Sequence, residues 1–144
     1  PAGTYLLNPE GFRHRPFSRE GCTLFVKLRQ FPGGDRRHVA TQTNELPWSG
    51  SGRAGTSLKV LYSQPPYTDR MRLERWESAA AAGPINFNQG AELFVIDGSF
   101  TDEHGCYRAH SWLRIPAGGA LRPTSSDSCE LYIKEGGFPY LRQD

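Results

Sequence analysis

The chain has 144 residues, a formal net charge of +2, and 37% hydrophobic and 12% aromatic residues. This length allows one domain with a fragment beside it, and the weak, scattered charge argues against nucleic acid as a partner. No apolar run is long enough to span a membrane and no signal peptide is visible, so we expect a cytoplasmic protein with no membrane partner. The 16 glycines and 11 prolines favour many turns over long helices.

The N-terminal stretch contains two short runs of β-forming residues around a tight turn. Tyr5–Leu7 and Cys22–Leu28 are predicted strands, and the Pro-x-Gly sequence at residues 9–11 predicts the turn. His14 follows this turn, at a position from which its imidazole could project into the interior of a barrel. The next residues, 33–55, are polar and rich in glycine and serine, which predicts a linker that Leu46–Trp48 could anchor to a flanking unit.

From about residue 56 onward, short strand patterns alternate regularly with turn residues. This spacing predicts a jelly roll or barrel and excludes a parallel α/β alternation. The predicted strands are Ser57–Tyr62, Arg70–Trp76, Glu92–Ile96, a return strand from Ser99, Cys106–Arg108, Ser111–Ile115, Ala120–Thr124 and Cys129–Lys134. Asp97-Gly98 is a predicted hairpin turn, residues 102–105 a second turn, and residues 78–84 a connection of small residues.

An internal repeat relates the two ends of the chain. Adding 107 to each residue number superimposes Ala2–Pro32 on Ala109–Pro139 without a gap. So long a period indicates duplicated domains. Cys22 and Cys129 occupy equivalent positions, and we expect both to be small buried strand residues without a redox role. The repeat predicts three parts: the C-terminal remnant of a first repeat (1–32), a linker (33–55) and a complete second domain (56–144).

Two stretches carry a resemblance to a known family. GAELFVIDGSFTDEHGCYRAHSWLRIPAGG at residues 90–119, paired with GTYLLNPEGFRHRPFSREGCTLFVKL at residues 3–28, resembles the cupin domain of the ChrR group. That group includes the sensor domain of the ChrR anti-sigma factor, stand-alone homologues, tandem bicupins and related dioxygenases that cleave diketone-type substrates. The resemblance implies an all-β fold, the cupin double-stranded β-helix or jelly-roll barrel, preceded here by the C-terminal strands of a truncated first cupin copy.

The resemblance also implies a metal site that the complete copy has lost. In members of the group, the resemblance implies a metal site built from a His-x-His pair, a Glu and a distant His. These ligands suit Zn or Fe. The four corresponding positions in the complete copy, which we expect to line the barrel, hold Ile85, Phe87, Ala91 and Leu121. His14 keeps the ligand identity, so it would bind Zn or Fe only in an intact first copy. Glu92 is expected to be an outward or hydrogen-bonded strand residue.

Two functions remain open at this point. The first is a non-catalytic ChrR-like sensor, binding or structural module without a cofactor, whose barrel packs solid or accepts a small apolar ligand. The second is part of a metal-dependent cupin dioxygenase-type enzyme whose active site lies in the first copy. A third hypothesis, direct anti-sigma activity, is less favoured because the helical zinc domain of that family has no counterpart in this sequence. The unpaired predicted strands in residues 2–28 favour a homodimer with these strands in the interface.

Overall fold

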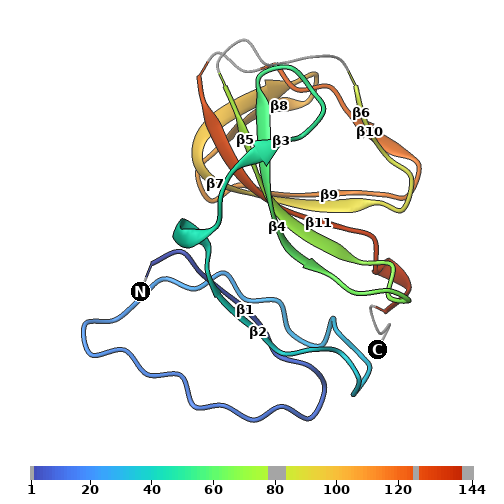
Figure 1. The fold of residues 1–144 in the computed structure, drawn as a ribbon. Coiled ribbons are helices and arrows are strands. Elements are labelled where there is room, and N and C mark those ends of the chain that lie inside the picture. Colours follow the sequence, from blue (N-terminus) through green and yellow to red (C-terminus); the bar gives the residue numbers. More distant parts are fainter. Residues whose placement is uncertain (1, 78–83, 125–126, 141–144) are drawn as a thin grey trace.

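The computed structural model describes residues 2–77, 84–124 and 127–140, and it consists of β-strands with two short 3-10 helices (Figure 1). The strands are β1 (Thr4–Leu7), β2 (Val39–Gln42), β3 (Ser49–Gly50), β4 (Thr56–Ser63), β5 (Arg70–Trp76), β6 (Ile85–Phe87), β7 (Ala91–Asp102), β8 (Gly105–Arg108), β9 (Trp112–Ile115), β10 (Gly119–Leu121) and β11 (Cys129–Glu135). The 3-10 helices are η1 (Thr43–Glu45) and η2 (Phe138–Tyr140). The predicted all-β fold is confirmed. The predicted connection over 78–84 lies, apart from its last residue, outside the described residues.

One large antiparallel sheet forms most of the barrel. Its strands follow the order β3-β4-β5-β11-β7-β8, and β9 also pairs with β7. A second, two-stranded sheet of β6 and β10 lies across from β4 and β5 in Figure 1. None of the helices in the described part of the chain is long and apolar enough to cross a membrane.

The predicted hairpin at Asp97-Gly98 is wrong, because β7 continues through it to Asp102. Gly98 adopts a φ of +73°, and a Cβ at this position would lie 1.9 Å from the carbonyl oxygen of Ser128. The pairing of β7 with β11 shifts register between Glu130 and Leu131, next to this glycine. Glycine therefore allows an irregular step and a close backbone approach within one continuous strand. The strand does turn at residues 102–105, as predicted, where β8 begins.

The register of the main sheet separates an inner face from an outer face. Residues that lie opposite each other in an antiparallel ladder share a face. Leu93 of β7 lies opposite Ile133 of β11, and Val95 lies opposite Leu131. All four side chains are buried in one apolar cluster, which we call the barrel core. Its buried members are Trp76, Phe87, Ala91, Leu93, Val95, Phe100, Ile115, Leu121, Cys129, Leu131 and Ile133.

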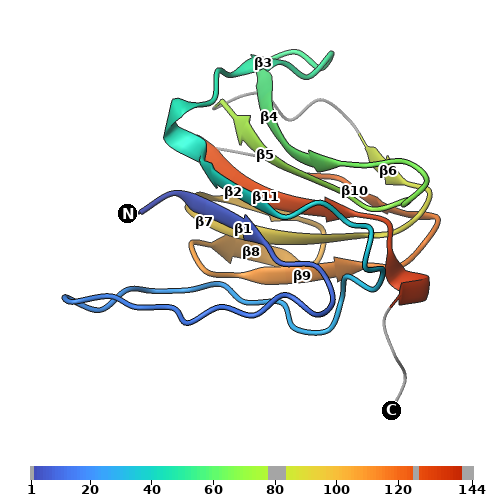
Figure 2. The same cartoon turned by 60° about the horizontal axis from the view of Figure 1, so that its bottom comes forward.

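A second buried cluster lies on the outer face of β4 and β5. It contains Leu7, Leu61, Tyr62, Met71 and Leu73. The ladder of β1 with β2 covers these residues, and Figure 2 shows this ladder in front of the main sheet. Residues 33–55, predicted as a linker, thus contain β2, η1 and β3, and Leu46 and Trp48 pack against the cluster.

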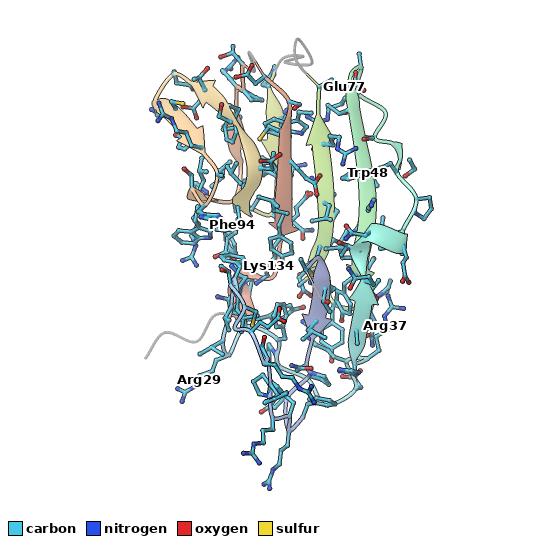
Figure 3. All side chains as sticks on the ribbon, turned by 90° about the vertical axis from the view of Figure 1, so that its left-hand side faces the viewer. Arg29, Arg37, Trp48, Glu77, Phe94 and Lys134 are labelled. Carbon is cyan, nitrogen blue, oxygen red and sulfur yellow. The ribbon has the colours of Figure 1, made fainter. Side chains whose placement is uncertain are left out.

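Residues 22–28 do not form the predicted strand. Their repeat equivalent, β11, is hydrogen-bonded to β5 on one side and β7 on the other, whereas this segment has no ladder partner in the described chain. The segment is extended along the outer face of the barrel, where Phe25 stacks on Phe94 at 4.2 Å between ring centroids. Figure 3 shows Phe94 and Lys134 on this face. Cys22 is exposed, which corrects the expectation that it is buried, and Cys129 is buried as expected.

Candidate ligand site

The four positions compared with metal ligands lie together in the barrel. Phe87, Ala91 and Leu121 are buried members of the barrel core, and the half-buried Ile85 packs against it. Leu121 lies directly opposite Ile85 in the β10–β6 ladder. These side chains carry no nitrogen, oxygen or sulfur, so they do not fit the metal ion that the family resemblance implies.

His14 lies apart from this set, in the long connection between β1 and β2. Its imidazole is exposed, its Nδ1 lies 3.4 Å from Asn8 Nδ2, and its ring lies 6.1 Å from that of Phe12. Within residues 2–77, 84–124 and 127–140, no three His, Cys, Asp or Glu side chains are grouped so that they could hold one metal ion.

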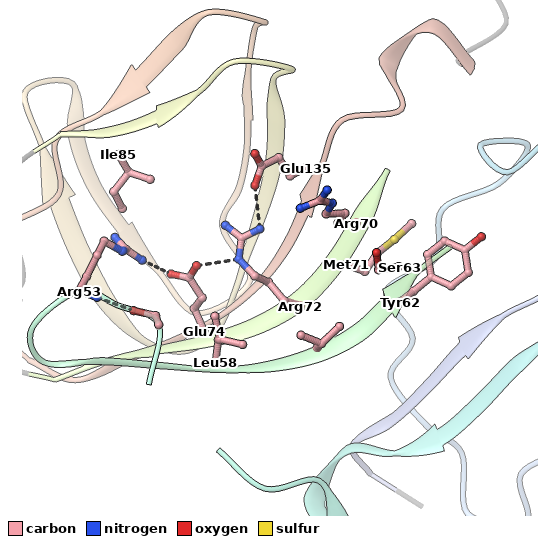
Figure 4. Close-up of a pocket in the computed structure, with 12 residues that line it drawn as sticks. Arg53, Leu58, Tyr62, Ser63, Arg70, Met71, Arg72, Glu74, Ile85 and Glu135 are labelled. Carbon is pink, nitrogen blue, oxygen red and sulfur yellow. Dashed lines mark hydrogen bonds and ion pairs between the residues drawn. The ribbon is translucent and has the colours of Figure 1, made fainter. Parts of the chain in front are cut away.

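A cavity of about 400 Å³ opens on the inner face of β4 and β5 (Figure 4). The register explains its lining, because Val60 lies opposite Arg72, Leu58 opposite Glu74, and Ser63 opposite Arg70. Ile85 reaches it from the other side, so the cavity adjoins the barrel core. The lining residues are Ser51, Arg53, Leu58, Val60, Tyr62, Ser63, Arg70, Met71, Arg72, Glu74, Ile85 and Glu135.

Glu74 is the centre of a charged network in this cavity. Its side chain is 3% exposed, and it accepts hydrogen bonds from Arg72 Nε at 2.7 Å and from Trp76 Nε1 at 2.8 Å. Arg53 forms a further ion pair with it, and Arg72 Nη1 donates to Glu135 Oε2 at 2.9 Å. Burial alone would lower the pKa of Arg72, but Glu74 and Glu135 outweigh it and raise the pKa. The two carboxylates therefore stabilise the charged form of Arg72 inside the barrel.

The expectation of an apolar barrel is correct for one side only. β7 and most of β11 contribute apolar side chains to the interior, whereas β5 contributes Arg70, Arg72 and Glu74 as well as Trp76, and the end of β11 contributes Glu135. The signal was present in the sequence RMRLERW, in which these three residues alternate with Met71 and Leu73. Sequence reasoning used only the apolar members of this alternation.

Glu92 lies on the outer face and belongs to a different cluster. It is 1% exposed, forms an ion pair with Lys27, and accepts hydrogen bonds from Arg114 Nε at 3.1 Å and Nη2 at 2.5 Å. Burial alone would raise its pKa, but the hydrogen bonds from Lys27 and Arg114 outweigh burial and lower it. Glu92 is thus a hydrogen-bonded strand residue, as expected. Burial raises the pKa of the Cys129 thiol to about 12, so this thiol is not a ready nucleophile.

Comparison with known proteins identifies a family for this sequence. The sequence model described as the ChrR cupin-like domain matches residues 36–139. A comparison with curated proteins gives no match.

Three solved structures resemble the fold at low sequence identity. An RmlC-like cupin protein from Ralstonia eutropha JMP134 aligns with a TM-score of 0.57 and 14% identity, over 65% of each chain. A putative acetylacetone dioxygenase from Methylibium petroleiphilum PM1 gives a TM-score of 0.62 and 12% identity, over 72% of this chain and 79% of that one. The Rhodobacter sphaeroides complex of SigE with the anti-sigma ChrR gives 0.55 and 16%, over 64% of this chain and 49% of that one. These matches show the cupin fold, and the chain spans less than two thirds of the first and third proteins.

Proposed function

Because the chain belongs to the family of ChrR cupin-like domains, we propose that it is a non-catalytic binding module of that family. The observation that carries this proposal is the chemistry of four side chains. Ile85, Phe87, Ala91 and Leu121 occupy the positions where the family resemblance implies metal ligands, and all four pack in or against the barrel core. A metal site would require nitrogen, oxygen or sulfur donors at these positions.

The module would act by binding a small molecule inside the barrel. A cavity of about 400 Å³ is within the usual size range for ligand sites, and it adjoins the barrel core. Binding of this kind suits a sensor or a regulatory domain, because a ligand that binds one conformation better than another shifts the balance between them.

The alternative is part of a metal-dependent dioxygenase-type enzyme with its active site in the first repeat. Its support in this chain is His14, the one position of the compared set that keeps an imidazole. The contacts of His14 are with Asn8 and Phe12 of its own loop, so other ligands would have to come from outside the described residues. The non-catalytic module is therefore the better-supported function.

The test is the metal content of the purified full chain. After dialysis against EDTA we expect far less than one Zn or Fe per chain by elemental analysis, and a melting temperature that EDTA does not change. One tightly held Zn or Fe per chain would overturn the proposal. Loss of that metal in His14→Ala, with the metal kept in His104→Ala, would then support the alternative.

A further inference from the structure

We propose that the cavity between β4, β5 and Ile85 binds a small organic monocarboxylate with an apolar body. This inference names the ligand class for the site of the proposed function and rests on that function. It depends on three properties of the lining: its net charge, a guanidinium and a hydroxyl at one end, and an uncovered apolar residue.

The charges that line the cavity leave one positive charge without a partner. Arg53 and Arg72 are ion-paired with Glu74, and Arg72 is also paired with Glu135. Arg70 lines the same cavity and is exposed, and it has no ion pair within the described chain. The three guanidinium groups and two carboxylates of the lining therefore sum to one positive charge. A single carboxylate neutralises this charge, whereas a phosphate dianion would leave excess negative charge beside Glu74 and Glu135.

One end of the cavity is polar. Arg70 lies between Ser63 of β4 and Glu135 of β11, so a guanidinium and a hydroxyl are side by side at one end. A guanidinium offers paired N–H donors that match the two oxygens of a carboxylate. Leu58, Val60 and Ile85 line the same cavity and supply the apolar surface. In Figure 4, Arg70 and Ile85 lie on opposite sides of the Glu74–Arg72–Glu135 network.

Val60 shows that part of this surface is uncovered. It lies opposite Arg72 on the inner face, yet 60% of it is exposed. Removing the surface of such an apolar residue from water is favourable in free energy. The apolar body of the ligand would cover Val60 while its carboxylate meets Arg70.

Titration of the full chain with matched naphthalene compounds tests this inference. The probes are 2-naphthoate and its neutral amide, 2-naphthamide, measured by calorimetry in buffer that contains EDTA. We expect 2-naphthoate to bind at least about tenfold more tightly than 2-naphthamide, because only the carboxylate meets Arg70. Arg70→Gln should remove this preference. Arg75→Gln, on the outer face of the same strand and paired with Glu130, is the matched control and should retain it.

Two outcomes overturn the inference. Equal binding of the two compounds would show that the cavity does not distinguish a charged carboxylate from a neutral amide. The proposed function would survive this outcome. A preference for 2-naphthoate that is unchanged in Arg70→Gln would place the anion elsewhere. Failure of the proposed function has a different signature, namely stoichiometric metal in the purified chain. Circular dichroism of each variant verifies that the fold is intact.

Discussion

Arg36 donates hydrogen bonds from Nη1 to both carboxylate oxygens of Asp69 at 3.0 Å, and neither side chain is exposed to solvent. The same nitrogen donates to the Tyr62 hydroxyl at 3.1 Å, and the Tyr67 ring lies 3.7 Å from the guanidinium carbon. Arg36 precedes β2 and Asp69 precedes β5, so this ion pair fixes the segment before β2 onto the barrel.

Removing one partner of this ion pair should strongly destabilise the protein. Asp69→Asn leaves the Arg36 guanidinium buried without a counter-charge, and we expect a loss of about 3–5 kcal/mol in the free energy of unfolding. Urea denaturation measures it. Arg37→Gln is the control, because Arg37 is the exposed neighbour, and it should cost less than about 1 kcal/mol. Similar losses in the two variants would contradict the structural role of the pair.

Lys134 should make the stability depend on pH in the alkaline range. Its side chain is fully buried, and burial lowers its pKa to about 8 although the nearby Glu92 opposes this. The unfolded chain keeps the ordinary value of about 10.5. Between these values the unfolded state binds the proton and the folded state does not, so the contribution of Lys134 to the free energy of unfolding rises with pH from about 8 to about 10.5. The Cys129 thiol, whose pKa burial raises from 9.0 to about 12, contributes the opposite slope above pH 9. Below pH 8 the cost of the buried charge is constant, roughly 3 kcal/mol.

Comparison of two variants isolates this effect. Lys134→Met should have a lower slope of unfolding free energy against pH than the wild-type protein between pH 8 and 10.5, measured by urea denaturation at several pH values. Gln30→Ala removes the hydrogen-bond acceptor, 3.1 Å from Lys134 Nζ, but keeps the titrating group. It should retain the slope of the wild-type protein. The same slope in Lys134→Met as in the wild-type protein would show that Lys134 does not contribute to the pH dependence.

Much of the fold of residues 56–144 follows from the sequence, because strand and turn patterns there are strong and regular. The segment 22–28 shows the limit of this reasoning. It has the same β-forming pattern as β11. A strand also requires neighbouring strands that pair with its backbone N–H and C=O groups, and such partners come from distant parts of the sequence. β5 shows a second limit. Both of its faces are buried, Met71 and Leu73 beneath β1 and β2, and Glu74 and Trp76 inside the barrel. Local alternation reveals two faces but not which one is interior.

Restoring donors at the four barrel positions should create a metal site. The variant combines Ile85→His, Phe87→His, Ala91→Glu and Leu121→His, at positions that lie together in and around the barrel core. We expect it to bind about one Zn per chain and to gain melting temperature when Zn is added. Without metal it should be less stable by several kcal/mol, because polar groups replace packed apolar ones. Elemental analysis and thermal melts measure both effects, and the wild-type chain under added Zn is the control. A folded variant without Zn affinity would mean that the four positions do not form one site.

The homodimer predicted from the N-terminal strands can be tested at the exposed side of residues 24–28. Phe25 and Lys27 face the barrel, whereas the alternating residues Leu24, Val26 and Leu28 are 62%, 58% and 76% exposed. This leaves a row of apolar side chains on an extended segment without a ladder partner in the described chain, a surface that a second copy could cover. Leu24→Ser combined with Leu28→Ser should weaken dimerisation at least about tenfold, because two leucines per chain would no longer be buried. Light scattering over a range of concentrations measures this, and Glu20→Ser in the same loop is the control. A wild-type chain that stays monomeric at high concentration, or a double variant that dimerises as well as Glu20→Ser, would show the dimer prediction to be wrong.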